Sequence, residues 1–127
     1  MTAQQYKKLN APSEDEEQAA VMDYCTGMSA KYPELKLIYH VPNEGKRGIA
    51  YAAKQKRIGL KPGVPDLCLP VPRKGFHGLY IELKSIDGRV NPKQEEWIKL
   101  LQEQGYRAEI CRGADRAIEV IAEYIKG

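Results

Sequence analysis

The pattern of apolar and polar positions along the chain predicts four helices and four strands. Apolar residues recur at helical spacing in the segments 13–30, 49–58, 92–104 and 114–126. Short runs rich in β-branched, aromatic and leucine residues predict strands at 37–41, 67–71, 79–86 and 106–111. The order is helix, strand, helix, strand, strand, helix, strand, helix. It predicts an α/β fold with a mixed β-sheet of about four strands flanked by helices.

Residues with strong capping preferences mark several of the predicted helix ends. Ser13 and Glu16 have the spacing of a capping box at the first helix. Asn91 followed by Pro92 is a favourable start for the third helix. Gly59 follows the second helix as a C-cap glycine. These local signals indicate where the predicted helices begin and end.

The length of 127 residues is suited to one domain. Residues 1–12 are polar and lack periodicity, so we expect a flexible N-terminal arm before a single domain at 13–127. The sequence has no apolar run long enough to span a membrane and no apolar stretch of signal-peptide type near its start. We therefore expect a cytoplasmic protein with no membrane partner.

The cysteines and histidines do not form a metal-binding pattern. Cys25, Cys68 and Cys111 are widely spaced in apolar surroundings and form no Cys-x-x-Cys pair, which predicts reduced, buried thiols. The two histidines, His40 and His77, are far from any other nitrogen or sulfur ligand in the sequence. A zinc site is therefore not expected.

Positive charge is concentrated in one part of the chain. The net charge of +3 is small, but the segment 43–62 carries six basic residues against one acid. Such a segment is typical of a surface that neutralises DNA phosphates, although a solvated helix face is the plainer interpretation. The candidate nucleic-acid-binding residues are Asn43, Lys46, Arg47, Lys54, Arg57 and Lys61.

The predicted strand 79–86 carries the first candidate chemical groups. Side chains alternate along a strand, so Tyr80, Glu82 and Lys84 share one face, and Leu79, Ile81 and Leu83 share the other. Taken alone, Glu82 and Lys84 are as easily explained by an ion pair within the sheet.

Asp66 changes that interpretation. It follows Pro65 at the entry to the preceding strand, where a neighbouring strand can bring its carboxylate beside Glu82. Mg²⁺ prefers a few carboxylates together with water and phosphate oxygens. Asp66, Glu82 and the backbone carbonyl of Leu83 would therefore make a suitable site, whereas a turn former after proline is the plainer role for Asp66.

Val64-Pro65-Asp66 followed by Ile81-Glu82-Leu83-Lys84 resembles the signature of the PD-(D/E)XK nucleases. The wider pattern resembles the VRR-NUC family, and most of all its small stand-alone members from phages and prophages. It includes Glu14 with Gln18, the segment 41–47, the segment 59–66, and Gln94 after Asn91-Pro92. The resemblance implies a restriction-endonuclease-like core.

The same resemblance implies roles for individual residues. Asp66 and Glu82 would be metal ligands, and Lys84 would position or activate the attacking water. A glutamate of the first helix would complete the metal site; we assign this role to Glu14, with Glu17 as the rival. Gln94 could orient water or phosphate, or it could bond back to the Asn91 backbone as a purely structural cap.

The expected function is therefore a Mg²⁺-dependent DNA endonuclease, with Mn²⁺ able to substitute and no organic cofactor. By analogy with the stand-alone members, we expect a homodimer that acts on branched DNA such as four-way (Holliday) junctions, in the host-cell cytoplasm if a phage encodes it. Two alternatives remain open at this point. One is a non-catalytic nucleic-acid-binding module, and the other is an RNA nuclease of the same superfamily.

Overall fold

A four-stranded mixed sheet lies at the centre of the protein, as predicted. The computed structural model describes residues 1–3, 5, 12–42 and 49–127. The strand order is β1-β2-β3-β4; the pairs β1–β2 and β2–β3 are antiparallel, and the pair β3–β4 is parallel. The strands are β1 (Tyr39–His40), β2 (Leu67–Leu69), β3 (Leu79–Lys84) and β4 (Arg107–Arg112). The strand that carries Glu82 and Lys84 is therefore central.

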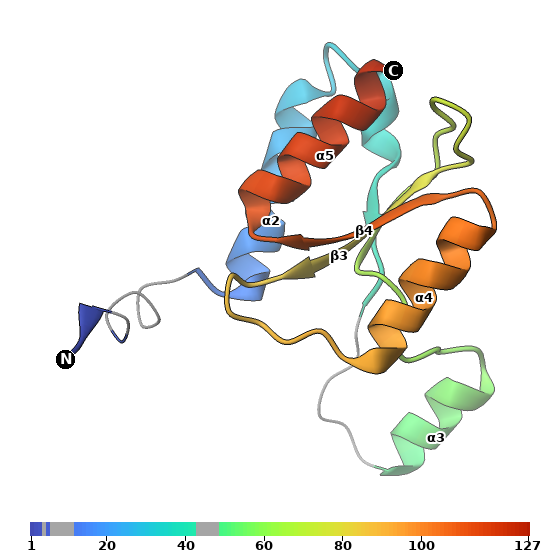
Figure 1. Ribbon diagram of the computed structural model, residues 1–127. Helices are drawn as coiled ribbons and strands as arrows, with labels where there is room; N and C mark the ends of the chain where they lie inside the picture. The colour runs from blue at the N-terminus through green and yellow to red at the C-terminus, as the bar shows by residue number, and fades with distance from the viewer. Residues whose placement is uncertain (4, 6–11, 43–48) are drawn as a thin grey trace.

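The helices cover both faces of this sheet. In Figure 1, α2 and α5 pack side by side over one face, α4 lies on the other face, and α3 lies beyond the first turn of α4. The helices are α2 (Glu14–Met28), α3 (Ile49–Arg57), α4 (Pro92–Glu103) and α5 (Ala114–Lys126), and a short 3-10 helix, η1, spans Pro33–Leu37. The predicted order of helices and strands is confirmed.

The hydrophobic core lies between the sheet and the helix pair α2 and α5. Leu79, Ile81 and Leu83 of β3 point into it and are at most 1% exposed. Tyr124 of α5 is fully buried and donates a hydrogen bond of 2.6 Å from its hydroxyl to the carbonyl oxygen of Val71. Because alternate residues of β3 fill this core, Glu82 and Lys84 must lie on the side that faces α4.

The helix caps form as the sequence predicts. The Ser13 hydroxyl accepts a hydrogen bond of 3.1 Å from the N–H of Glu16 at the start of α2. At α4, Asn91 and Gln94 form a complete capping box. The predicted C-terminal helix, 114–126, has the observed boundaries. The cysteine prediction is also confirmed, because all three thiols are free and buried.

The first three strands are shorter than predicted, and the fourth, Arg107–Arg112, has the predicted length but lies one residue further along the chain. Leu37, the first residue of the predicted strand 37–41, ends the 3-10 helix that Pro33 starts, and β1 spans only Tyr39–His40. The second strand ends at Leu69, directly before Pro70, which has no N–H for a ladder. The third ends at Lys84, where the chain turns and the N–H of Gly88 bonds to the Ser85 carbonyl at 3.0 Å.

Some predictions fall on residues outside the described part of the chain. Most of the predicted arm at 1–12 lies there, and so do the candidate DNA-contacting residues Asn43, Lys46 and Arg47. Within the described ranges, none of the helices has both the length and the apolar character needed to cross a membrane.

Candidate functional site: an acidic cluster beside Lys84

Asp66 is fixed at the point where three strands meet. It is 7% exposed and directly precedes β2. Its Oδ2 accepts a hydrogen bond of 2.9 Å from the backbone N–H of Leu83 in β3. Its carbonyl oxygen accepts a bond of 2.7 Å from the N–H of Val41, just beyond β1. The carboxylate is therefore held against the strand that carries Glu82.

Pro65 gives the neighbouring backbone an unusual feature. The β2–β3 register pairs Leu67 with Ile81, and extending it by two pairs places Pro65 opposite Leu83. Proline has no N–H, so Pro65 cannot bond to the Leu83 carbonyl as another residue would. The Leu83 N–H and C=O point toward the same edge of an extended strand. This carbonyl is therefore left on the side where Asp66 lies, as a potential ligand.

Glu82 and Lys84 share the face of β3 that the alternation pattern predicts. Both are buried, at 2% and 8% exposure. Lys84 Nζ lies 3.6 Å from Oε1 of Glu82, a contact made by a cation and a carboxylate two positions apart on one strand. Two side chains that alternate onto one face of the strand thus bring a cation and an acid together beside Asp66.

Gln94 joins α4 to the same cluster. Its Nε2 donates a hydrogen bond of 2.7 Å to Oε1 of Glu82, and the contact is buried. Its Oε1 accepts a bond of 3.1 Å from the N–H of Asn91, which completes the capping box. The sequence left two alternatives for Gln94, a helix cap at Asn91 and a contact within the site. Both contacts are present. One amide group uses its oxygen for the cap and its nitrogen for Glu82.

The second carboxylate oxygen of Glu82 lacks a partner among the described residues. Oε2 is buried and is the one side-chain N or O atom of this kind in the described part of the chain. A buried acceptor without a hydrogen bond is costly and calls for a proton, a water molecule or a cation. Burial, followed by the nearby Asp66 carboxylate, raises the pKa of Glu82 to about 8, and Lys84 opposes that rise.

The pKa values of Asp66 and Glu14 are raised as well. Burial is the main cause that raises the pKa of Asp66, while the Leu83 N–H and the Lys84 charge oppose it. Burial also raises the pKa of Glu14, and the negative charge of Asp66 adds to that effect. Three acids crowded together in this way share a negative potential that a divalent cation would relieve.

The two rival glutamates of α2 have different surroundings. Glu14, in the first turn, lies in the electric field of Lys84 and Asp66. Glu17 is buried, and its Oε2 accepts a hydrogen bond from the N–H of Ala114 at the start of α5. A carboxylate at a helix N-terminus is stabilised by the free N–H groups and the helix dipole. Glu17 therefore has a structural partner, whereas Glu14 is close enough to Lys84 and Asp66 for their charges to shift its pKa.

The donor set fits a hard divalent cation that keeps some of its water. Within the described ranges, no group of three or more His, Cys, Asp or Glu side chains could hold a metal ion. Mg²⁺ does not need such a group, because it binds through one or two carboxylates and completes its octahedron with water and phosphate oxygens. Asp66, Glu82 with its unpaired oxygen, the Leu83 carbonyl and the approaching Glu14 suit that requirement.

His40 is a neighbour of the site that the sequence did not single out. Tyr39 and His40 form β1, a short edge strand, and both side chains are exposed. Nδ1 of His40 lies 3.1 Å from the carbonyl oxygen of Asp66. The signal that could have identified it is its place in an edge strand paired with the strand that follows Asp66.

Three of the candidate DNA-binding residues lie in the described part of the chain, on α3 and in the turn that joins it to the strand β2. Lys54 and Arg57 are exposed on α3, and Lys61 is exposed in the turn that follows it. No acidic residue occurs in α3. The structure thus places a basic surface next to the helix that carries Gln94.

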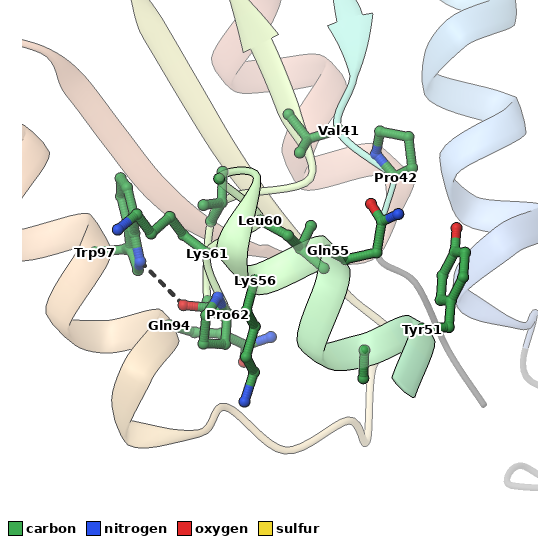
Figure 2. A pocket seen from close by; sticks show the side chains of 14 residues that line it. Val41, Pro42, Tyr51, Gln55, Lys56, Leu60, Lys61, Pro62, Gln94 and Trp97 are labelled. Atoms are coloured by element: carbon green, nitrogen blue, oxygen red, sulfur yellow. Dashed lines mark hydrogen bonds between the residues drawn. The ribbon is translucent and has the colours of Figure 1, made fainter. Parts of the chain in front are cut away.

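A cavity of about 500 Å³ separates α3 from α4. Figure 2 shows Trp97 and Tyr51 at its two ends, with Leu60 and Gln55 between them. The indole N–H of Trp97 donates a hydrogen bond of 3.0 Å to the carbonyl oxygen of Pro62, which ties the turn after α3 to α4. Gln94 is part of both the lining and the acidic cluster.

Comparison with known proteins agrees with this geometry. The VRR-NUC domain profile matches residues 24–115. A solved structure described as a VRR_NUC domain protein is 37% identical to this chain and superposes with a TM-score of 0.80. The match covers 92% of this chain and 91% of that protein's chain. No curated protein matches the chain significantly.

Proposed function

This chain belongs to the VRR-NUC family and carries a nuclease-type domain, and on that premise we propose that it is a Mg²⁺-dependent endonuclease that hydrolyses DNA phosphodiester bonds. The observation that carries the proposal is the buried, unpaired Oε2 of Glu82 beside Asp66 and Lys84. Such an atom is rare in a folded protein unless a ligand uses it.

Asp66, Glu82, the Leu83 carbonyl and Glu14 would hold the metal ion. A bound Mg²⁺ supplies Lewis acidity, which lowers the pKa of a coordinated water and stabilises charge on a phosphate oxygen. Mn²⁺ has similar ligand preferences and should replace it.

The protein's own groups have distinct tasks in this proposal. Lys84 orients the attacking water and offsets the negative charge that develops on the phosphate during in-line displacement. Gln94 fixes the Glu82 carboxylate by its hydrogen bond of 2.7 Å to Oε1 and leaves Oε2 available to the metal ion. Lys54, Arg57 and Lys61 hold the DNA backbone without reading its sequence.

The proposed substrate is branched DNA, in particular a four-way junction. The support is analogy with the stand-alone proteins that this chain resembles. A homodimer with two-fold symmetry would place two equal sites across a junction, which allows paired cuts in opposite strands.

The test compares substrates and metals. Supercoiled plasmid, linear duplex, a synthetic four-way junction and RNA of the same sequence would be incubated with Mg²⁺, Mn²⁺ or EDTA. We expect cuts in DNA with either metal, fastest in the junction, and none with EDTA. Asp66→Asn keeps an acceptor for the Leu83 N–H but loses the charge, so it should abolish cleavage and leave the melting temperature little changed.

Lys84→Ala should also abolish cleavage, and Lys99→Ala is its matched control because Lys99 is exposed on α4. A non-catalytic module is the second candidate, since the Glu82–Lys84 contact of 3.6 Å is what a purely structural ion pair would show. Full DNA binding without metal-dependent cuts on any substrate would favour that module. Cuts in RNA alone would favour an RNA nuclease.

A further inference from the structure

The cavity between α3 and α4 adjoins the acidic cluster on two sides. Gln94 contributes to its lining and at the same time bonds to Glu82. Val41 and Val64 line it as well, and Val41 is bonded through its N–H to the carbonyl of Asp66. A ligand in the cavity would therefore lie next to a phosphate at Asp66 and Glu82.

The lining has the chemistry of a nucleobase site. Trp97 and Tyr51 provide aromatic rings, Pro42, Pro62 and Leu60 provide apolar contact, and Gln55 provides an amide that can both donate and accept hydrogen bonds. Bases stack on aromatic rings regardless of their identity, because every base has a π-face. The volume of about 500 Å³ falls within the range of roughly 300–1,000 Å³ seen for pockets that bind small organic molecules.

The charges around the cavity favour an anionic ligand. Lys56 and Lys61 belong to the lining, and none of the described lining residues is acidic. Lys54 and Arg57 add positive charge on the same helix. A phosphate-binding surface alone would need the lysines but not an apolar hollow with aromatic walls.

We infer that this cavity receives an unpaired base of the DNA strand that is being cut, next to the scissile phosphate. The inference rests on the proposed function and deepens it, since it defines the substrate as DNA with an unstacked nucleotide beside the cut. A base inside a duplex cannot enter a cavity on the protein surface until it leaves the stack, and bases at branch points and bulges do so at low cost. Trp97, held by its bond to Pro62, would be the stacking platform.

The experiment uses binding in EDTA, so that it does not depend on cleavage. Two duplexes of the same sequence would be compared, one fully paired and one with a single unpaired 2-aminopurine. Trp97 is the single tryptophan of the chain, so its fluorescence reports directly on the cavity. We expect tighter binding of the unpaired duplex by about tenfold, with quenching of tryptophan emission.

Filling the cavity should remove that preference. Ala52 lines the cavity, whereas Ala53 on the same helix does not, so Ala52→Phe and Ala53→Phe form a matched pair. We expect Ala52→Phe to bind both duplexes equally and without quenching, and Ala53→Phe to behave as the wild type. Gln55→Phe, one turn along the same face, serves as a second filling variant if Ala52→Phe melts early.

Equal affinity of the wild type for the two duplexes would overturn the inference. A preference that survives both filling variants would also overturn it, because the lysines alone would then explain the binding. These results are separable from the proposed function. A wild-type protein that cleaves DNA but binds the two duplexes equally refutes only the role of the cavity. A wild-type protein that prefers the unpaired duplex but cleaves no DNA refutes only the nuclease.

Discussion

The amide nitrogen of Gln94 lies 2.7 Å from Oε1 of Glu82, while the amide oxygen of the same side chain accepts from the backbone of Asn91. The start of α4 and the central acid of the cluster are therefore held by one group. Because the Glu82 side chain is locked in this way, its free oxygen has a fixed direction. Changes at Gln94 should separate the stability of the helix from the activity of the site.

Gln94→Glu is the sharpest of these changes. Glutamate at this position can still accept from the Asn91 N–H, so the capping box is kept. It cannot donate to Glu82 and adds a negative charge beside it. We expect the melting temperature to change little and the cleavage rate to fall by roughly 10–100-fold, as is usual when a partner that orients a metal ligand is lost.

Gln94→Ala should reduce both the melting temperature and the cleavage rate, since it removes the cap interaction as well as the bond to Glu82. Gln102→Ala on the same helix is the control, because the Gln102 amide bonds to the carbonyl of Ala108, away from the cluster. Rates equal to the wild type in Gln94→Glu would contradict a positioning role. Thermal unfolding and single-turnover cleavage of labelled DNA are the two measurements.

The stability of the metal-free protein should fall as the pH rises. Burial and Asp66 raise the pKa of Glu82 from 4.5 to about 8, so the folded state holds a proton that the unfolded chain has released. The resulting stabilisation is complete below pH 4.5 and is lost as the pH rises through about 8. In EDTA we expect a melting temperature lower by on the order of a few degrees at pH 9 than at pH 6.

Glu82→Gln should flatten this dependence, because the amide has no proton to lose. Mg²⁺ should restore stability mainly at high pH, since carboxylates must be ionised to bind a metal. A wild-type melting temperature that rises between pH 6 and pH 9 in EDTA would show that Glu82 is ionised in the fold.

Glu14 and Glu17 should respond in opposite ways to the same substitution. Glu14→Ala removes a carboxylate whose pKa responds to the charges of Lys84 and Asp66, and we expect a large loss of Mg²⁺-dependent cleavage with near-normal stability. Glu17→Ala leaves the N–H of Ala114 without its buried partner, which should cost about 1–3 kcal/mol of unfolding free energy. The free energy of unfolding in urea and the cleavage rate are measured for Glu14→Ala and for Glu17→Ala. Equal effects on both quantities would remove the distinction.

The basic surface should bind DNA through its phosphates. Lys54→Ala, Arg57→Ala and Lys61→Ala should each weaken binding on every DNA sequence and reduce the slope of log K against log salt by about one. Lys36→Ala, in the 3-10 helix η1, is the control. Binding titrations at several salt concentrations measure the slopes, and unchanged slopes in all three variants would exclude these residues from the DNA interface.

The sequence alone was enough to predict the order of elements and the helix caps. Caps such as Ser13 with Glu16 are local, because the bonds they form span three residues. The side-chain alternation of β3 is local too, so Glu82 and Lys84 were placed on one face without knowledge of the rest of the fold.

The lengths of the first three strands depended on tertiary pairing and were overestimated. An apolar run such as 37–41 can be extended or helical, and the choice depends on the partner strand and on Pro33. The choice between Glu14 and Glu17 was equally beyond the sequence. Both lie in one acidic run, and only the packing of α5 against α2 gives Glu17 its own partner.

The motif residues and their spacing were thus determined by the sequence, while their joint geometry was decided by the fold. Asp66 reaches Leu83 because β2 and β3 pair in one register, and Gln94 reaches Glu82 because α4 packs on that face of the sheet. The cavity is built from segments around residues 41, 51–64 and 94–97. No local pattern could predict it, because a cavity is a property of distant segments brought together by packing.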